Sequence, residues 1–186
     1  GNNHLTLPGG GTGTITGNVT FGAGVERISI ASGQITGWAD QGNGDDFFDI
    51  SAGNVTGTLQ QGNGLDDFRM TGGEIGALNQ GGDLDTFFMS SGRIVDAFDD
   101  GDIARMTGGR IGRVNMKLAD NLFDMSGGTI DRNLVTGFGN DTIIISGGTI
   151  GGNISVSGGT DSVTNTGGSV GREVGEGAGS GSFGWG

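Results

Sequence analysis

The stretch "TGFGNDTIIISGG", residues 136–148, decides how this chain folds. Gly137 and Gly139 flank a phenylalanine, Asp141 follows, and apolar residues then run on to Gly147 and Gly148. Glycines in such pairs supply tight turns, and alternating inward and outward side chains are typical of a half-buried strand. The stretch therefore indicates one short strand between two glycine corners, a unit too small to bury its apolar side chains alone.

The same unit recurs along the chain at spacings of 17–20 residues. Glycines that open a G-x-[IV] triplet are Gly13, Gly33, Gly53, Gly73, Gly92, Gly109, Gly128, Gly148 and Gly168. Stacking the units aligns four apolar columns, of which one contains Ile28, Phe48, Phe68, Phe87, Ala104, Phe123, Ile143 and Val163. Units that can bury their apolar face only against their neighbours form a solenoid. The pattern predicts an all-β, right-handed parallel β-solenoid (β-helix) of about eight coils, and the handedness follows the crossover rule for parallel strands.

The repeats divide the chain into three segments. We expect an N-terminal lead-in over residues 1–12, solenoid repeats over 13–174, and a Gly/Ser-rich linker or tail over 175–186. Neither end shows an obvious capping structure of the kind that solenoids need. Uncapped coils would expose unpaired strand edges, so end-to-end self-association is one expected mode of interaction.

Composition limits the classes of partner. The 186 residues include 45 glycines, one proline and no cysteine, and the net charge is −12. A nucleic-acid backbone would be repelled, whereas cations would be attracted. We find no apolar run near the roughly 20 residues that a membrane span needs. Nucleic-acid binding and a membrane span in this chain are therefore not expected.

An acidic column follows the glycine corners. A G-x-G-x-[DE]-x-Φ pattern, where Φ is apolar, occupies residues 22–28, 42–48, 62–68 and 137–143, with a degenerate copy at 81–87. The aligned column contains Glu26, Asp46, Asp66, Asp85, Asp102, Asn121, Asp141 and Asp161. Stacked coils would bring like carboxylates to about 5 Å, where they repel one another. Ca²⁺ is the expected offset, because it takes carboxylate and carbonyl oxygens in tight turns.

Two interpretations of the acidic column remain open at this point. The acids can hold Ca²⁺, or they can accept hydrogen bonds from nearby backbone N–H groups as ordinary turn residues. The candidate metal ligands are Glu26, Asp46, Asp66, Asp85 and Asp141. Over residues 92–127 the loop pattern is lost, and a continuous row is not expected there.

The loops resemble the nonapeptide of repeats-in-toxin proteins, G-G-x-G-x-D-x-U-x, which holds Ca²⁺ between stacked coils. The first glycine of that motif is mostly replaced here, by Phe21, Gln41, Gln61 and Thr136. Tandem units such as "GNDTIIISGGTIGGNISVSGG", residues 139–159, are similar to the passenger regions of bacterial autotransporters. This second resemblance implies a β-helix displayed outside the cell, with an extracellular or bacterial outer-surface location.

The leading functional hypothesis is a non-enzymatic structural and adhesive β-solenoid, a passenger-like stalk or adhesin fragment whose receptor or glycan is open. The alternative is a subunit of an extracellular fibre formed by end-to-end stacking and stabilised by Ca²⁺. A polysaccharide-acting β-helix enzyme is the third class. It is disfavoured because no unit exceeds 20 residues, which leaves no insertion to wall a cleft.

Overall fold

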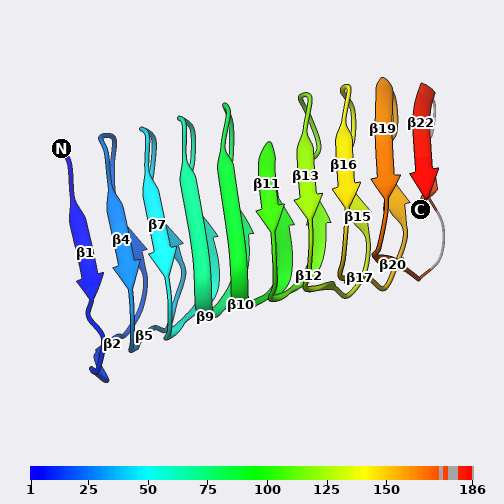
Figure 1. The fold of residues 1–186 in the computed structure, drawn as a ribbon. Coiled ribbons are helices and arrows are strands. Elements are labelled where there is room, and N and C mark those ends of the chain that lie inside the picture. The colour runs from blue at the N-terminus through cyan, green and yellow to red at the C-terminus, as the bar shows by residue number, and fades with distance from the viewer. Residues whose placement is uncertain (172–173, 176–179, 186) are drawn as a thin grey trace.

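The computed structural model describes residues 1–171, 174–175 and 180–185, and the side chains of residues 1–171. These residues form 22 strands and no helix, and every strand pairing is parallel. Figure 1 shows the strands standing side by side from the N-terminus to the C-terminus, each coil contributing one strand to the visible wall. The protein is a parallel β-solenoid of about eight coils, as the repeat predicted.

The strands of one wall, here called the front wall, follow the glycine loops in each coil. They are β1 (His4–Leu7), β4 (Arg27–Ile30), β7 (Phe47–Ile50), β11 (Ile103–Met106), β13 (Leu122–Met125), β16 (Thr142–Ile145), β19 (Thr160–Asn165) and β22 (Ser180–Trp185), with the first halves of β9 (Asp67–Asn79) and β10 (Thr86–Asp99). Buried and outward side chains alternate along them, so one face of the wall lines the core.

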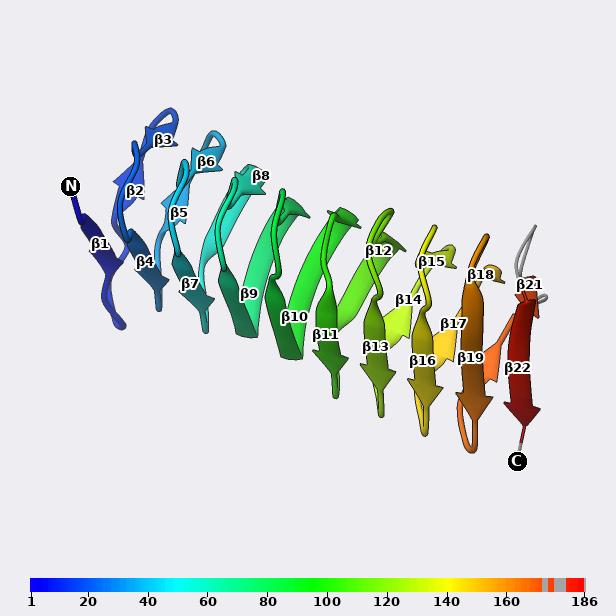
Figure 2. The same ribbon diagram turned by 90° about the horizontal axis from the view of Figure 1, so that it is seen from above.

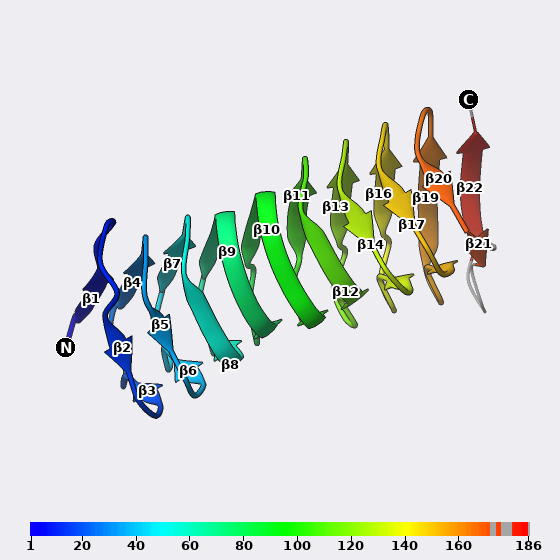
Figure 3. The ribbon, with the colours of Figure 1, turned by 90° about the horizontal axis from the view of Figure 1, so that it is seen from below.

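The opposite wall, here called the back wall, consists mostly of two-residue strands separated by a bend. They are β2 (Thr14–Ile15), β3 (Val19–Thr20), β5 (Gln34–Ile35), β6 (Ala39–Asp40), β8 (Asn54–Gln60), β12 (Arg110–Asn115), β14 (Thr129–Ile130), β15 (Leu134–Val135), β17 (Thr149–Ile150), β18 (Ile154–Ser155), β20 (Ser169–Val170) and β21 (Val174–Gly175). β9 and β10 continue from the front wall into this one. Figures 2 and 3 show the two walls as separate layers along the rod.

The core lies between the walls, and the predicted columns form it. Ile28 pairs with Phe48, Phe48 with Phe68 and Phe68 with Phe87 in successive coils. All four side chains are at most 3% exposed. The rings of Phe48 and Phe68 stack with centroids 5.6 Å apart, and those of Phe68 and Phe87 at 5.2 Å. Stacking of equivalent residues therefore continues through the interior of the rod.

The shortest coil shows how the core tolerates a change of side chain. Ala104 follows Phe87 in the column and leaves a space that a phenylalanine would fill. Phe98, from the back-wall half of β10, stacks on Phe87 with the centroids 4.2 Å apart. A Cβ on Gly101 would collide with the Phe98 ring, so a glycine is required there. Phe98 stays in register with Leu78 and Val114, and its ring extends the phenylalanine stack beyond Phe87.

The ends of the solenoid differ from the expected segments. β1 pairs in register with β4, so residues 4–7 belong to the first coil and not to a lead-in. Leu5 pairs with Ile28, 23 residues later, and this spacing hid the strand from a search for a 20-residue period. β22 pairs with β19, so part of the expected tail 175–186 also continues the stack. Residues 172–173, 176–179 and 186 lie outside the described part of the chain.

Candidate functional site

The eight residues of the acidic column form one row along the edge of the rod, here called the acid row. It runs beside the stacked glycine loops that lead into the front wall. Each member is at most 6% exposed: Glu26, Asp46, Asp66, Asp85, Asp102, Asn121, Asp141 and Asp161. The five acids predicted as metal ligands all belong to this row. Seven carboxyl groups buried in a single row are costly unless their oxygens find partners.

One oxygen of most of these side chains has a backbone partner in the preceding coil. The N–H of Glu26 donates to Asp46 Oδ1 at 2.8 Å, and the N–H of Asp46 donates to Asp66 Oδ1 at 2.9 Å. Four more bonds of this kind follow, each from the backbone N–H of the first residue to the carboxylate of the second. The pairs are Asp66 and Asp85, Asp85 and Asp102, Asn121 and Asp141, and Asp141 and Asp161. Each aspartate of the row therefore satisfies the N–H of its neighbour in the preceding coil, whereas Glu26 Oε1 accepts from Asn3 Nδ2 at 3.1 Å.

The second oxygen of these carboxyl groups is buried and accepts no hydrogen bond. This holds for Glu26 Oε2 and for Oδ2 of Asp46, Asp66, Asp85, Asp141 and Asp161. An unpartnered buried carboxylate oxygen costs free energy comparable to a lost hydrogen bond or more. The row thus presents a series of oxygens, about one per coil, that require a proton or a cation.

Burial raises the pKa of these groups. The pKa of Asp46 and that of Asp66 rise from near 3.8 to about 7, and that of Asp85 rises to about 8. Loss of solvation is the largest cause in each, and nearby carboxylates raise the values further, while the backbone hydrogen bonds oppose the shift. Burial also raises the pKa of Asp102 and of Asp141.

The acid row is interrupted at one step only. The described part of the chain has no hydrogen bond from the N–H of Asp102 to the Asn121 side chain. That side chain instead donates from Nδ2 to the carbonyl oxygen of Thr136 at 2.9 Å. The expected break over residues 92–127 is therefore narrower than the sequence suggested, because Asp102 still accepts from the N–H of Asp85.

The glycine loops supply further oxygens. Among the described residues, no hydrogen bond reaches the carbonyl oxygens of Gly42 and Gly44. A Cβ on Gly44 would collide with the carbonyl oxygen of Gly24, and a Cβ on Gly62 with that of Gly42. Carboxylate and carbonyl oxygens are the ligand types that Ca²⁺ prefers, and the acid row and the glycine loops supply both types. The donor types present therefore suit this ion.

Loop conformation is kept even where the glycines are lost. Five non-glycine residues in the described part of the chain have positive φ: Asp83, Asp100, Lys117, Ala119 and Ser157. Lys117 and Ala119, for example, occupy the two glycine positions of the loop and stack beneath Gly137 and Gly139. Such a backbone costs about 1–2 kcal/mol for a residue with a Cβ. The stack therefore imposes the loop shape on sequences that disfavour it.

Sequence reasoning missed a row of buried glutamines beside the acids. Gln41, Gln61 and Gln80 are fully buried, at the position where the nonapeptide has its first glycine. The Nε2 of Gln61 donates both to Gln41 Oε1 at 3.1 Å and to the carbonyl of Asp67 at 3.1 Å. These amides close the neck of each loop, and their signal in the sequence was the replacement of that glycine.

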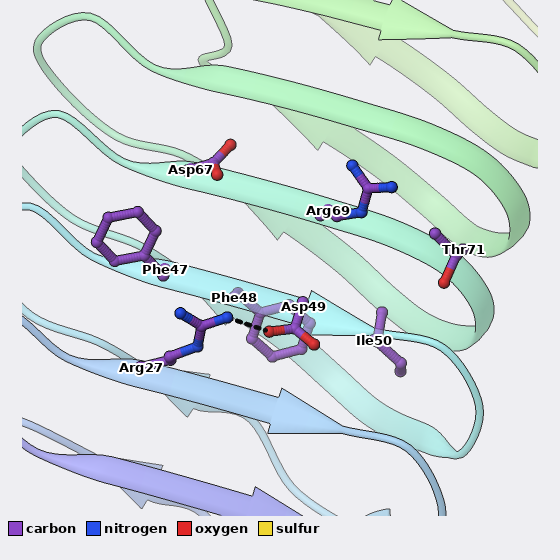
Figure 4. Close-up of a pocket in the computed structure, with 8 residues that line it drawn as sticks. All are labelled: Arg27, Phe47, Phe48, Asp49, Ile50, Asp67, Arg69 and Thr71. Atoms are coloured by element: carbon purple, nitrogen blue, oxygen red, sulfur yellow. Dashed lines mark hydrogen bonds and ion pairs between the residues drawn. The ribbon is translucent and has the colours of Figure 1, made fainter.

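A second concave feature lies on the outer side of the front wall. It is an open pocket of about 300 Å³. Figure 4 shows its lining side chains on β4, β7 and β9. Arg27 pairs with Asp49 at 3.4 Å and lies 6.0 Å from the Phe47 ring centroid. Arg69 lies 4.7 Å from the ring centroid of Phe88. The arginine side chains therefore already contact acidic and aromatic side chains of neighbouring strands, and these contacts make up much of the pocket surface.

The described residues lack both a cluster of metal-ligating side chains and a membrane-spanning helix. They contain no group of three or more His, Cys, Asp or Glu side chains that could hold a metal ion. A cation in the acid row would therefore need main-chain oxygens beside one or two carboxylates. No described helix is long and apolar enough to cross a membrane.

This chain is similar in fold to a solved structure. It is described as the X-ray crystal structure of a hyperactive, Ca2+-dependent, beta-helical antifreeze protein from an Antarctic bacterium. The TM-score is 0.59 at 20% identity, over 92% of this chain and 56% of that one, so this chain spans about half the length of that structure. No family model and no curated protein sequence matches. The likeness establishes the β-helical fold.

Proposed function

We propose that this chain is a non-enzymatic, extracellular β-solenoid stiffened by Ca²⁺ along the acid row, and that it serves as a passenger-like stalk or adhesin. The observation that carries the proposal is the series of buried carboxylate oxygens without partners. Where these acids ionise, as the pH rises through about 7 to 8, positive charge along the same edge would stabilise the rod. A rigid rod would hold an adhesive surface away from the structure that bears it.

The ligands would be the carboxylates of Asp46, Asp66 and Asp85, joined by carbonyl oxygens of the glycine loops, with Glu26 and Asp141 in the outlying coils. When bound, Ca²⁺ would neutralise neighbouring carboxylates in successive coils. A site with few carboxylates has a modest affinity, in the range of about 10⁻⁴–10⁻³ M that extracellular modules use. The Ca²⁺ dependence in the description of the similar structure supports the choice of ion.

Thermal unfolding with and without Ca²⁺ tests the proposal. An ion that binds only the native state stabilises it by about 2.7 kcal/mol when the free ion concentration is 100 times its Kd. We expect the Tm to rise with Ca²⁺ at millimolar concentration and to fall back when a chelator is added, with Mg²⁺ as the matched control ion. Mg²⁺ should stabilise less because it demands stricter octahedral geometry. An unchanged Tm in chelator would contradict the proposal.

End-to-end assembly into a fibre is the second candidate. Leu5, Leu7, Ile15 and Val19 of the first coil are only partly buried against the core. Their strands pair on one side only among the described residues. In the 186-residue chain taken alone, a coil from a second copy could cover this edge. Long unbranched fibres in electron micrographs are the expected result, whereas a strictly monomeric sedimentation profile would count against assembly.

We do not extend antifreeze activity to this chain. The aligned repeats contain a hydroxyl column, and the register shifts within it, because Thr71 pairs with Ser91 and not with Ser90. The column is Ser51, Thr71, Ser90, Thr107, Ser126, Ser146 and Thr166. It is one residue wide, and the neighbouring outward positions on the front wall change from Asp49 to Arg69 to Phe88. A crystal lattice is periodic, so its recognition favours a surface that repeats in two dimensions.

A further inference from the structure

Trp38 is an exception in the back wall. Its side chain is exposed, with 42% of the residue's surface accessible. The register places Asn18 before it and Thr58 after it in the same column. Asn18 has a structural role there, because its Oδ1 accepts from the N–H of Trp38 at 3.0 Å. An indole cannot accept that bond from the next coil, so Trp38 gives up a ladder contact and exposes apolar surface.

A hollow of about 450 Å³ lies beside the indole. It is lined by Trp38, Asp40, Gly57, Thr58 and Gln60. Trp38 and Asp40 flank the buried Ala39, while Thr58 and Gln60 flank the buried Leu59 in the next coil. The strands β6 and β8 that carry them lie side by side in Figure 3. The four outward side chains therefore form a two-by-two array, about 5 Å across the strands and about 7 Å along them.

The polar members of this array keep hydrogen-bonding capacity. Asp40 Oδ1 accepts from the N–H of Gly42 at 2.9 Å, and its Oδ2 has no partner in the described residues. The side chains of Thr58 and Gln60 likewise make no hydrogen bond within this part of the chain. The array thus offers a carboxylate acceptor, an amide with donor and acceptor ends, and a hydroxyl, all beside a flat aromatic surface.

We propose that this array is a binding site for a neutral saccharide. A sugar ring presents an apolar C–H face, which suits the indole, and a rim of hydroxyls that both donate and accept hydrogen bonds. No cationic side chain lines the hollow, and the chain carries a net charge of −12. An anionic sugar would therefore be repelled by Asp40, whereas a neutral sugar can donate a hydroxyl to it.

Phe47 provides the contrast that makes this assignment specific. It is 40% exposed on the front wall, nearly as much as Trp38. Its ring is approached by the Arg27 guanidinium at 6.0 Å, and Arg27 is itself paired with Asp49. The Trp38 ring has no such cation in the described part of the chain. Phe47→Ala is therefore a matched control that removes an exposed aromatic ring from a paired site.

The inference goes beyond the proposed function, since a Ca²⁺-stiffened rod does not require a sugar site. The chain has two tryptophans, so a Trp185→Phe background leaves Trp38 as its sole indole. We would titrate this protein with maltohexaose, cellohexaose and chitohexaose, and with oligogalacturonate as the anionic probe. The readouts are tryptophan fluorescence and ligand-observed NMR, in Ca²⁺ and again in chelator.

We expect saturable binding of at least one neutral probe, with a Kd of about 0.1–10 mM because an open wall buries little of the ligand. Trp38→Ala should weaken it about tenfold or more, Asp40→Asn should weaken it less, and Phe47→Ala should leave it unchanged. Circular dichroism would verify that Trp38→Ala is folded, and Trp38→Phe should keep part of the binding. Failure of every neutral probe, or preference for oligogalacturonate, would overturn the site. A Tm insensitive to Ca²⁺ together with sugar binding would remove the calcium proposal alone.

Discussion

Asp66 accepts a hydrogen bond from the backbone N–H of Asp46 through Oδ1 at 2.9 Å, while its buried Oδ2 has no partner. The two roles that the sequence left open for this acid, turn acceptor and cation ligand, thus fall on different oxygens of one side chain. The first oxygen holds successive loops in register. When the group is ionised, the second carries a charge that the described residues do not compensate.

The change in Tm caused by Asp46→Asn should differ in sign between Ca²⁺ and chelator. The amide Oδ1 can still accept from the N–H of Glu26, but the charge is lost. With Ca²⁺ we expect the Tm to fall by about 3–8 °C, from a loss of about 1–2 kcal/mol. In chelator near pH 8 the Tm should rise or stay level, because a buried charge has been removed.

Two control variants accompany Asp46→Asn. Asp161→Asn lies in a loop where Ser157 replaces the first glycine, and it should lower the Tm in Ca²⁺ by less. Asp124→Asn removes the same charge from the outward side of β13 and should have little effect in either condition. Equal effects of Asp46→Asn in Ca²⁺ and in chelator would contradict a cation in the acid row.

Stability without Ca²⁺ should fall as the pH rises. The folded-state pKa is about 7 for Asp46 and Asp66 and about 8 for Asp85, against about 3.8 when these groups are unperturbed. Between these values the folded state holds protons that the unfolded state has lost, so raising the pH favours unfolding. The contribution is complete below about pH 4 and is lost by about pH 8.

The Tm in chelator, measured from about pH 5 to pH 8, checks this sign. The rise in Tm produced by Ca²⁺ should grow over the same range, because the ion competes with protons for these carboxyl groups. Asp66→Asn should flatten the pH dependence in chelator. A Tm in chelator that increases towards pH 8 would show that the carboxyl groups are ionised in the folded protein without the ion.

Ala119→Gly should stabilise the protein. Ala119 has φ of 74°, at the position where Gly139 lies in the next coil. Relief of about 1–2 kcal/mol of backbone strain outweighs the added freedom of glycine in the unfolded chain, about 0.4–1 kcal/mol. Urea denaturation should show a gain of about 0.5–1 kcal/mol with an unchanged m value. Gly139→Ala is the reverse variant, and it should lose more because its Cβ would collide with the Ala119 carbonyl.

Gln61→Leu should destabilise the protein by about 2–4 kcal/mol. It removes the donor to the Asp67 carbonyl and to Gln41 Oε1, and it removes the acceptor for Gln80 Nε2, all inside the core. The adjacent Gln60→Leu, on the outward side of the same strand end, is the control and should change stability by about 0.5 kcal/mol or less. Similar losses for both variants would show that the amide ladder contributes nothing specific.

Much of the site was readable because the repeat samples each position many times. The acids from Glu26 to Asp161 could be aligned without a structure, and all of them are buried in one row. The glutamine ladder was harder to foresee, since Gln41 and Gln61 look like exposed polar residues in a loop. Only the stacked geometry shows that their amides span the loop neck to a strand carbonyl.

The sequence by itself determined the fold class, the coil period and the identity of the core columns, because a periodic apolar pattern can be buried in few ways. The tertiary structure decided which oxygen of Asp66 is used and which is left, that Phe98 stacks on Phe87, and that Trp38 lies across from Thr58. These are relationships between residues about 11 to 20 positions apart in the chain. They depend on the register of one coil on the next, and only the folded stack fixes it.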